Sequence, residues 1–182
     1  IPGKFYLQQG VCEGNPDVDA IFRLTNKNID IRFKKNYSFS LGKAISPLNS
    51  QNTIWFPEAY SLLYLPSTCS MRCTDIWRSL VANRIFEEYK WPMLFDKPSV
   101  NQTRNVHDLM DDFYNEILLY KENENITKEL FNINLSPKVE DINNNMVKCY
   151  KLFVKKGLLQ KKEIKLLKIW LEDFEKIKNI NY

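Results

Sequence analysis

The stretch from Ser67 to Lys90 constrains the fold of this chain most, because it joins a polar turn to a long helical pattern of apolar residues. That pattern places apolar side chains on two adjacent rows, at Ile76, Leu80, Trp77, Val81 and Ile85. Thr74 stands where a helix N-cap is expected, and Asp75 falls in the first turn, at the positive end of the helix dipole. The sequence predicts that Asp75 is held rigidly at a helix start, with Arg72 and Arg78 beside it. Helix capping alone would also explain Asp75.

The composition indicates one compact globular unit. The chain has 182 residues, of which 44% are hydrophobic and 13% aromatic, so a sizeable core is possible and global disorder is excluded. No apolar run approaches the length that crosses a bilayer, so we expect no membrane span in this chain. The first residue is Ile1, and no basic and apolar leader precedes a strand-like segment, which leads us to expect a chain that begins in mid-protein.

The basic charge is concentrated at the C-terminal end. The formal net charge is +4, and the residues from Lys138 onward hold 11 lysines against 6 acidic residues. Lysines interleaved with leucine and isoleucine at helical spacing usually form a solvated helix face. We therefore expect no nucleic-acid partner.

The four cysteines, at positions 12, 69, 73 and 149, match neither a zinc site nor a redox pair. Cys69 and Cys73 lie four residues apart without a second pair of ligands nearby. Free thiols in a reducing compartment are the interpretation we favour, which predicts a cytoplasmic location.

The first third of the chain reads mainly as short strands and polar loops. Strands are expected at residues 4–9, 29–33 and 53–56, and residues 18–24 fit either a strand or a short helix. An amide-rich loop at 46–52 precedes the third strand, and Pro57 starts a helical segment over 58–65.

The rest of the chain is mostly helical. A short strand at 91–95 and a polar loop at 97–105 lead to His107, the one histidine of the sequence. Helices are expected over 106–131, 139–155 and 161–180. Because the composition changes after Pro137, we expect two regions, an α/β part at 1–136 and a lysine-rich helical appendage at 137–182.

Five stretches in order resemble one family, the STELLO-type glycosyltransferases. They are Gln8-Gln9-Gly10, the segment from Pro16 to Thr25, the segment from Asn49 to Thr53, Asp75-Ile76-Trp77-Arg78 with Arg84, and Arg104-Asn105-Val106-His107. The resemblance covers about residues 4–131 and leaves the lysine-rich end outside. The chain is also similar, more weakly, to the reversibly glycosylated polypeptides, which act as nucleotide-sugar mutases or transferases.

Both resemblances imply an α/β, GT-A-like fold of which this chain is the C-terminal, acceptor-side part. In such folds an N-terminal half binds the nucleotide and carries an acidic metal motif. No acidic triplet after an apolar strand occurs here, and the first βα unit is missing.

The family resemblance also implies roles for two residues. Asp75 matches the carboxylate that faces the acceptor and, in an inverting enzyme, deprotonates its hydroxyl group. His107 matches a late histidine that completes the divalent-metal site on the nucleotide diphosphate. Imidazole is a poor ligand for Mg²⁺, so the resemblance implies Mn²⁺ as the metal.

The remaining candidates would bind substrate. Arg72 and Arg78 would hold phosphate or acceptor, with surface ion pairs as the alternative. Trp77 would offer a face on which a sugar stacks, with core packing as the alternative. Asn49 and Asn52 would bind sugar hydroxyl groups, or satisfy only the backbone of their own loop.

The function expected is metal-dependent transfer of a sugar from a nucleotide-diphosphate donor to a carbohydrate or glycoconjugate acceptor. A nucleotide-sugar mutase is the second enzymatic alternative, because it would rearrange the sugar without an acceptor. A non-catalytic, glycosyltransferase-like partner of a polysaccharide-synthesising complex is the third alternative.

Overall fold

A computed structural model of the chain describes residues 3–26, 29–33, 38–40 and 45–180, and the side chains of these residues up to position 178. Its four-stranded sheet has the order β2-β4-β1-β3. The strands are β1 (Leu7–Gly14), β2 (Phe39–Ser40), β3 (Thr53–Trp55) and β4 (Met93–Gln102). The central strands β1 and β4 run parallel, and β3 and β2 pair antiparallel on the two sides. The sheet and the helices confirm the α/β class.

Two strands are longer than the sequence predicted. The strand expected at 4–9 runs on through Gly10 to Gly14, and the loop expected from Lys97 is instead the second half of β4. The two extensions pair with each other, with a shift in register between Gly10 and Cys12. Neither extension has a strong strand pattern in its own sequence. Each is kept extended by the hydrogen bonds that the other strand supplies.

The strand expected at 29–33 is wrong. Ile31 forms an isolated antiparallel bridge with Gly14, and its neighbours among the described residues belong to no strand. Alternation of apolar and charged residues makes a strand possible, but only a free sheet edge beside it makes one stable.

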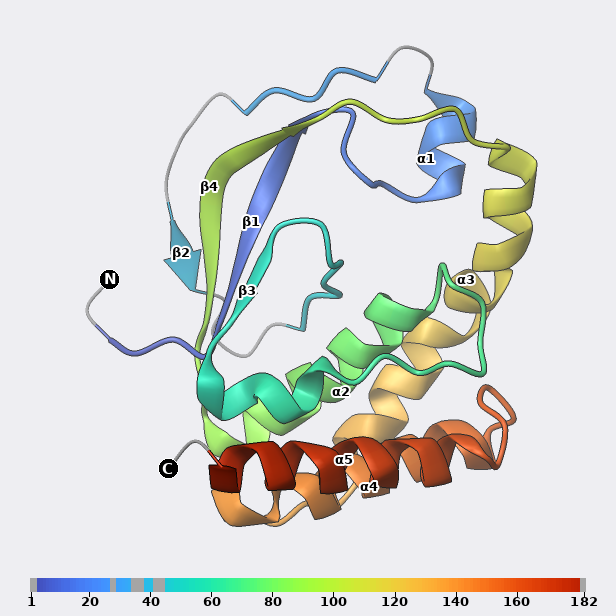
Figure 1. Cartoon of the computed structure of the whole chain (residues 1–182). Coiled ribbons are helices and arrows are strands. Elements are labelled where there is room, and N and C mark those ends of the chain that lie inside the picture. Colours follow the sequence, from blue (N-terminus) through green and yellow to red (C-terminus); the bar gives the residue numbers. More distant parts are fainter. Residues whose placement is uncertain (1–2, 27–28, 34–37, 41–44, 181–182) are drawn as a thin grey trace.

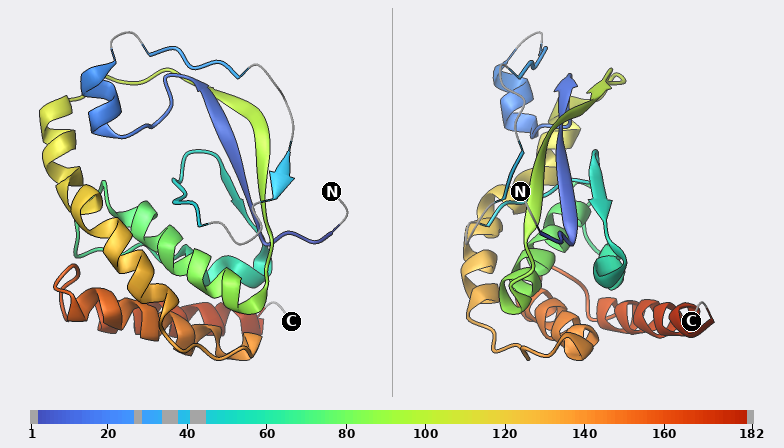
Figure 2. Two further views of the ribbon diagram at one scale, coloured as in Figure 1. Left: turned by 180° about the vertical axis from the view of Figure 1, so that it is seen from behind. Right: turned by 90° about the vertical axis from the view of Figure 1, so that its left-hand side faces the viewer.

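The helices lie on one side of the molecule, below and beside the sheet in Figure 1. They are α1 (Ala20–Thr25), η1 (Pro57–Leu63), α2 (Thr74–Tyr89), α3 (Leu109–Phe131), η2 (Val139–Asp141), α4 (Ile142–Lys155) and α5 (Glu163–Ile180). The segment that fitted strand or helix is thus helical, and the segment after Pro57 is a 3₁₀ helix. In Figure 1 and both views of Figure 2, α2, α4 and α5 form a base under the sheet, and α3 rises from this base to α1.

The helix predicted after the polar turn is α2, but its cap differs from the prediction. Thr74 is the first helical residue, and its hydroxyl donates a hydrogen bond to the carbonyl of Met71. Cys73 occupies the N-cap position in right-handed helical geometry, with no side-chain hydrogen bond to the helix. The turn at 71–73 leads directly into the helix, so no extended residue is present from which a threonine could cap it.

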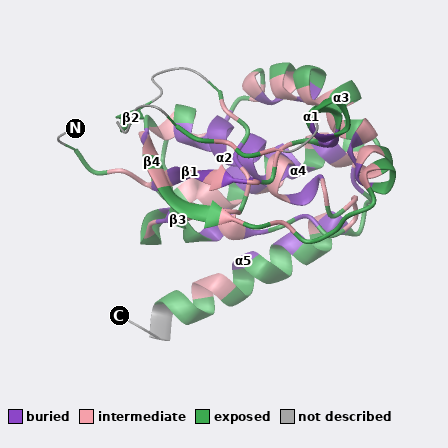
Figure 3. Ribbon diagram, turned by 90° about the horizontal axis from the view of Figure 1, so that it is seen from above, coloured by how far each residue is buried: buried purple, intermediate pink, exposed green. Residues whose placement is uncertain are grey.

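The C-terminal helices share one hydrophobic core with the α/β part. Trp77 of α2 is fully buried, and its ring lies 5.5 Å from that of Phe153 on α4. Tyr150 of the same helix packs edge-on against Tyr64, with ring centroids 5.4 Å apart. Figure 3 shows the buried inner residues of α4, whereas α5 lies at the rim with an exposed outer face. The residues after 137 therefore pack on the α/β part.

Glu163, the first residue of α5, is fully buried and holds the segment between η1 and α2. Its carboxylate accepts hydrogen bonds from the backbone N–H groups of Ser67 and Thr68, at 3.0 and 2.9 Å. The hydroxyl groups of Tyr64 and Thr68 donate to it as well. These four donors fix the start of the turn that leads to α2.

None of the helices in the described ranges is both long and apolar enough for a transmembrane segment.

Candidate functional site

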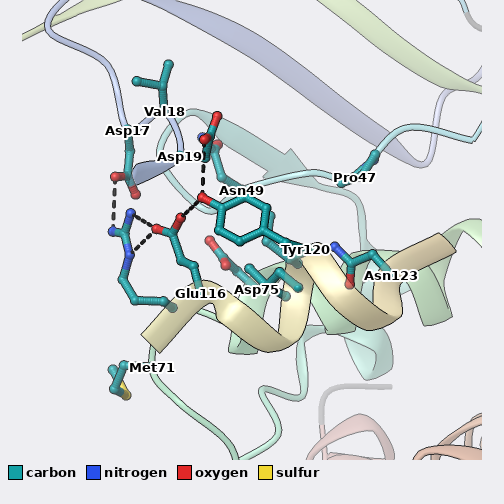
Figure 4. A pocket seen from close by; sticks show the side chains of 13 residues that line it. Asp17, Val18, Asp19, Pro47, Asn49, Met71, Asp75, Glu116, Tyr120 and Asn123 are labelled. Atoms are coloured by element: carbon teal, nitrogen blue, oxygen red, sulfur yellow. Dashed lines mark hydrogen bonds and ion pairs between the residues drawn. The ribbon is translucent and has the colours of Figure 1, made fainter. Parts of the chain in front are cut away.

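Two pockets adjoin at the start of α2 and share Asp17, Arg72 and Asp75 in their walls. The first, here called the carboxylate pocket, has a volume of about 410 Å³ and is seen in Figure 4. Its other lining residues are Val18, Asp19, Pro47, Asn49, Met71, Ile76, Glu116, Leu119, Tyr120 and Asn123. The second, the histidine pocket, has a volume of about 350 Å³ and is further lined by Ser50, Gln51, Gln102, Arg104, Asn105 and His107.

Buried polar residues of α2 position the amide-rich loop that lines both pockets. The Ser79 hydroxyl accepts a hydrogen bond from the backbone N–H of Leu48 at 2.9 Å. One turn further along α2, the Asn83 side chain donates to the carbonyl of Ser46 at 3.0 Å. A buried backbone group requires a partner, so these two side chains fix the path of the loop over the helix.

Asp75 is bound to the same loop. Its carboxylate accepts a hydrogen bond from the backbone N–H of Ser50 at 3.0 Å. The Ser50 hydroxyl in turn accepts from the guanidinium of Arg78 at 2.9 Å. Burial raises the pKa of Asp75, and the Ser50 hydrogen bond and the charge of Arg78 offset part of this rise. Asp75 is therefore a partly desolvated carboxylate, more basic than an ordinary one, in the wall between two pockets.

Arg72 is held by the carboxylates of other elements. Its guanidinium donates to Glu116 of α3, with Nε at 2.8 Å from Oε1, and to Asp17 at 3.2 Å. On the other side of Asp17, Arg104 approaches the same carboxylate oxygen at 2.6 Å. Burial raises the pKa of Asp17, but the hydrogen bonds from Arg104 and Arg72 lower it below the ordinary value. Two guanidinium groups thus keep Asp17 ionised.

Glu116 connects α3 with the segment before α1. Arg72 contacts Oε1, whereas Oε2 accepts a hydrogen bond from the backbone N–H of Ala20 at 2.8 Å and lies 2.6 Å from the hydroxyl of Tyr120. That hydroxyl also lies 3.2 Å from Asp19, as the dashed lines in Figure 4 indicate. Burial and the hydrogen bond with Glu116 raise the pKa of Tyr120, so it stays protonated at neutral pH.

His107 lies in the loop before α3, whereas the sequence placed it in the first turn of a helix starting at 106; Asp108 caps the helix, which begins at Leu109. Its side chain is 42% exposed, and Nδ1 lies 3.6 Å from a carboxylate oxygen of Asp112, which also accepts from Arg104 at 3.1 Å. Within the described ranges, no three His, Cys, Asp or Glu residues form a group that could hold a metal ion. These residues therefore do not make a complete metal site by themselves, and His107 contributes one accessible imidazole.

The structure brings four of the seven candidate residues to the two pockets. Arg72 and Asp75 line both pockets, Asn49 lines the carboxylate pocket and His107 lines the histidine pocket.

The other three candidates, Trp77, Arg78 and Asn52, are outside both linings. Trp77 is fully buried, so it packs in the core and offers no face to a sugar. Arg78 is 5% exposed and stacks on the ring of Trp55, 5.1 Å from its centroid, so it does not form the surface ion pair expected as the alternative. The amide nitrogen of Asn52 donates to the carbonyl of Val11 and to Ser99. In this structure Asn52 thus satisfies the loop, the alternative to sugar binding.

Several residues of the site were not predicted from the sequence, chiefly Asp17, Glu116 and Arg104. Asp17 and Arg104 stand in stretches that resemble the family, and this was the one signal available for them. Asp17 pairs with Arg72, 55 positions away, and with Arg104, 87 positions away. Glu116 pairs with Arg72 across 44 positions. The spacing of residues within one segment cannot predict contacts between segments so far apart in the sequence.

The arrangement suits chemistry in which a hydroxyl group loses a proton near a charge-compensated site. Asp75 provides a basic carboxylate at the junction of the two pockets. The carboxylate pocket holds four carboxylates against one guanidinium, whereas the histidine pocket holds two carboxylates, two guanidinium groups and an imidazole. Ligands of different charge therefore suit the two pockets.

Comparison with known proteins agrees with the resemblance of the sequence. The family model described as STELLO glycosyltransferases matches residues 72–181, a range that includes the lysine-rich helices left outside the sequence motifs. The chain is 35% identical over 92 residues to Probable glycosyltransferase STELLO1 of Arabidopsis thaliana, a match that covers 47% of this chain and 12% of that protein. It is 31% identical over 107 residues to Probable glycosyltransferase STELLO2 of the same plant, covering 55% of this chain and 14% of that protein.

The matched range holds most of the site, including Arg72, Asp75, Arg104, His107 and Glu116. The chain spans only about an eighth of the length of the two curated relatives that it matches. Because the family model covers more than half of this chain, the family is established: the chain belongs to the STELLO glycosyltransferases.

Proposed function

We propose that this chain forms the acceptor-side part of a nucleotide-sugar-dependent glycosyltransferase with a GT-A-like fold. The observation that carries the proposal is the position of Asp75, which lines both pockets and has a raised pKa. In the proposal the donor diphosphate lies in the histidine pocket beside Arg72, Arg104 and His107, and the acceptor lies in the carboxylate pocket. Asp75 then lies where the two pockets meet, beside the acceptor hydroxyl group that faces the anomeric carbon.

The proposed chemistry is direct displacement with inversion. Asp75 takes the proton of the acceptor hydroxyl group while its oxygen attacks the anomeric carbon and the diphosphate leaves. The raised pKa favours this role, because a carboxylate of higher basicity is a better proton acceptor at neutral pH. Arg72 and Arg104 offer positive charge to the departing diphosphate, and desolvation makes such charges more effective.

We further propose that the site uses a divalent metal ion, Mn²⁺, with His107 as one ligand. The remaining ligands would come from the diphosphate and from outside the described residues. The described residues by themselves contain no group of three His, Cys, Asp or Glu side chains that could hold a metal ion. When bound, the metal would supply positive charge to the leaving group.

Activity of the Asp75→Asn variant of the complete gene product tests the catalytic role. Asparagine keeps the size of the side chain and an oxygen for the Ser50 N–H but cannot accept the proton. We expect turnover to fall by about 10²–10⁴-fold while nucleotide affinity is retained. Equal turnover of variant and wild type would remove Asp75 from the mechanism.

A thermal-shift panel of nucleoside diphosphates, with and without Mn²⁺, tests the donor site. A ligand present at 100 times its dissociation constant stabilises the folded state by about 2.7 kcal/mol, which is readily measured. We expect one nucleotide to give a shift that needs Mn²⁺ and disappears in His107→Ala but not in Asp75→Asn. The absence of any shift would favour the non-catalytic partner instead.

A further inference from the structure

We infer that the acceptor of this enzyme is an uncharged sugar, held in the carboxylate pocket by the side-chain amides of Asn49 and Asn123. The inference rests on the proposed function, because it assumes that the carboxylate pocket is the acceptor site. It adds the class of acceptor and a binding residue, Asn123, that sequence reasoning did not single out.

The orientation of Asn123 is fixed by the core beneath it. The indole Nε1–H of Trp77 can only donate a hydrogen bond, and it lies 3.1 Å from Oδ1 of Asn123. The amide oxygen therefore faces α2, and the –NH₂ group lies on the opposite side, where Asn123 lines the pocket (Figure 4). No acceptor for this –NH₂ group occurs among the described residues.

Asn49 presents a second donor by the same logic. Its Oδ1 accepts a hydrogen bond from the backbone N–H of Gln51 at 3.2 Å, and a backbone N–H can only donate. The –NH₂ group of Asn49 is thus turned away from Gln51, and it too has no acceptor in the part of the chain that the structure describes.

The pocket also offers acceptors. Asp75 has the basic carboxylate already described, and Asp19 uses one oxygen, Oδ1, to cap α1 through the N–H of Phe22. Each hydroxyl group of a sugar both donates and accepts a hydrogen bond, so paired amide donors and carboxylate acceptors suit neighbouring hydroxyl groups. The 410 Å³ volume is within the usual range of small-molecule sites.

The charge of the pocket restricts which sugar can enter. Asp17, Asp19, Asp75 and Glu116 face one guanidinium in the lining, that of Arg72. Arg104 pairs with Asp17, and the charge of Arg78 acts on Asp75, both from outside the lining. When both are counted with Arg72, the four carboxylates still outnumber the guanidinium groups by one. A ligand with its own carboxylate or phosphate is repelled, and a neutral sugar is not.

The test measures sugar binding without a donor, by saturation-transfer NMR with competition, on the complete gene product. The probes are the methyl glycosides of glucose, galactose and xylose, and those of glucuronate and galacturonate, which differ from the first two by one carboxylate. We expect at least one neutral glycoside to bind at least about tenfold more tightly than its uronate.

Two variants locate the binding in this pocket. Asn123→Asp keeps an oxygen for the indole of Trp77 and replaces the donor, so affinity for the neutral glycoside should fall by about fivefold or more. Asp19→Asn keeps a good helix cap and removes one negative charge, so the gap between neutral and uronate glycosides should narrow. Asn125→Asp, which adds the same charge at an exposed position of α3, is the matched control and should change neither value.

Equal affinity for a neutral glycoside and its uronate would overturn the inference, and so would the absence of binding by every probe or an equal effect of Asn123→Asp and Asn125→Asp. Different results would contradict the proposed function and the inferred class of acceptor. If the binding preference is found but Asp75→Asn turns over at the wild-type rate, the acceptor class stands and the catalytic role falls. If instead a uronate acceptor is glycosylated with full dependence on Asp75, the catalytic role stands and the acceptor class falls.

Discussion

The starts of α2 and α5 each place a carboxylate in a first helical turn, and the two sites differ in how that carboxylate is used. Glu163 of α5 is fully buried, and donors from Tyr64, Ser67 and Thr68 surround it. Asp75 of α2 accepts from the N–H of Ser50 and lines two pockets. Similar local sequence positions therefore give one carboxylate that is closed off by the protein and one that is open to a ligand.

The two carboxylates differ both in burial and in the number of donors that surround them, and these differences separate a structural carboxylate from one that can act on a ligand. A buried carboxylate with a full set of donors gains stability from them and has no capacity left for a substrate. A carboxylate with few donors in a desolvated pocket retains the capacity to accept a proton or a hydroxyl group. The variants below test this distinction.

The largest expected effect on stability is that of Glu163→Ala. The substitution leaves two backbone N–H groups and two hydroxyl groups without their acceptor, and unsatisfied buried donors are strongly destabilising. We expect the free energy of unfolding to fall by about 3–5 kcal/mol, measured by chemical denaturation.

Glu172→Ala is the matched control for this variant, because Glu172 lies on the same helix and is exposed. Its effect should stay within about 0.5 kcal/mol. If the two variants were equally stable, Glu163 would not hold the segment between η1 and α2.

A smaller effect is expected for Tyr64→Phe. This substitution removes one of the donors to Glu163 and leaves the ring that packs against Tyr150 in place. The loss should be about 1 kcal/mol, as for a single hydrogen bond. A double-mutant cycle with Glu163→Gln measures the coupling, and additive effects in that cycle would contradict a direct interaction.

The smallest effect is that of Asp75→Asn on stability, and its sign is opposite. Because burial raises the pKa of Asp75, the folded state binds the proton more tightly than the unfolded state, and stability decreases as pH rises above the ordinary carboxyl range. At neutral pH the charged group opposes folding, so the variant should melt slightly higher than wild type. The difference should shrink as pH is lowered through the folded pKa, and a variant that melts lower at pH 7 would contradict the pKa shift.

The elements with strong local patterns could be predicted from the sequence. The helices α2, α3, α4 and α5 have apolar residues at helical spacing, and their predicted positions agree with the structure to within a few residues. The extensions of β1 and β4 and the missing strand at 29–33 could not be predicted, because each depends on whether a partner strand is available. That information is not local to any segment.

Part of the site was predictable for a similar reason. Asp75 stands in the first turn of a helix and His107 just before one, each after a polar stretch, which is a local signal. The distinction between Trp77 as a sugar platform and Trp77 as a core residue needed the position of Phe153, 76 residues further on. Asn123 carries no signal of its own, since its role depends on the orientation that the Trp77 indole imposes.

The pairing of β1 with β4 has a consequence for the time course of folding. Leu7 pairs with Met93, and Thr68 reaches Glu163 across 95 residues, so contacts of high sequence separation frame the segment that carries Asp75. Contacts of this kind form late and slow the folding of a domain. On the ribosome, β1 waits for β4, and the turn before α2 waits for the start of α5. The candidate site is therefore among the last parts of this chain to be assembled, and a chain that stops short of α5 lacks the carboxylate that holds the turn before α2.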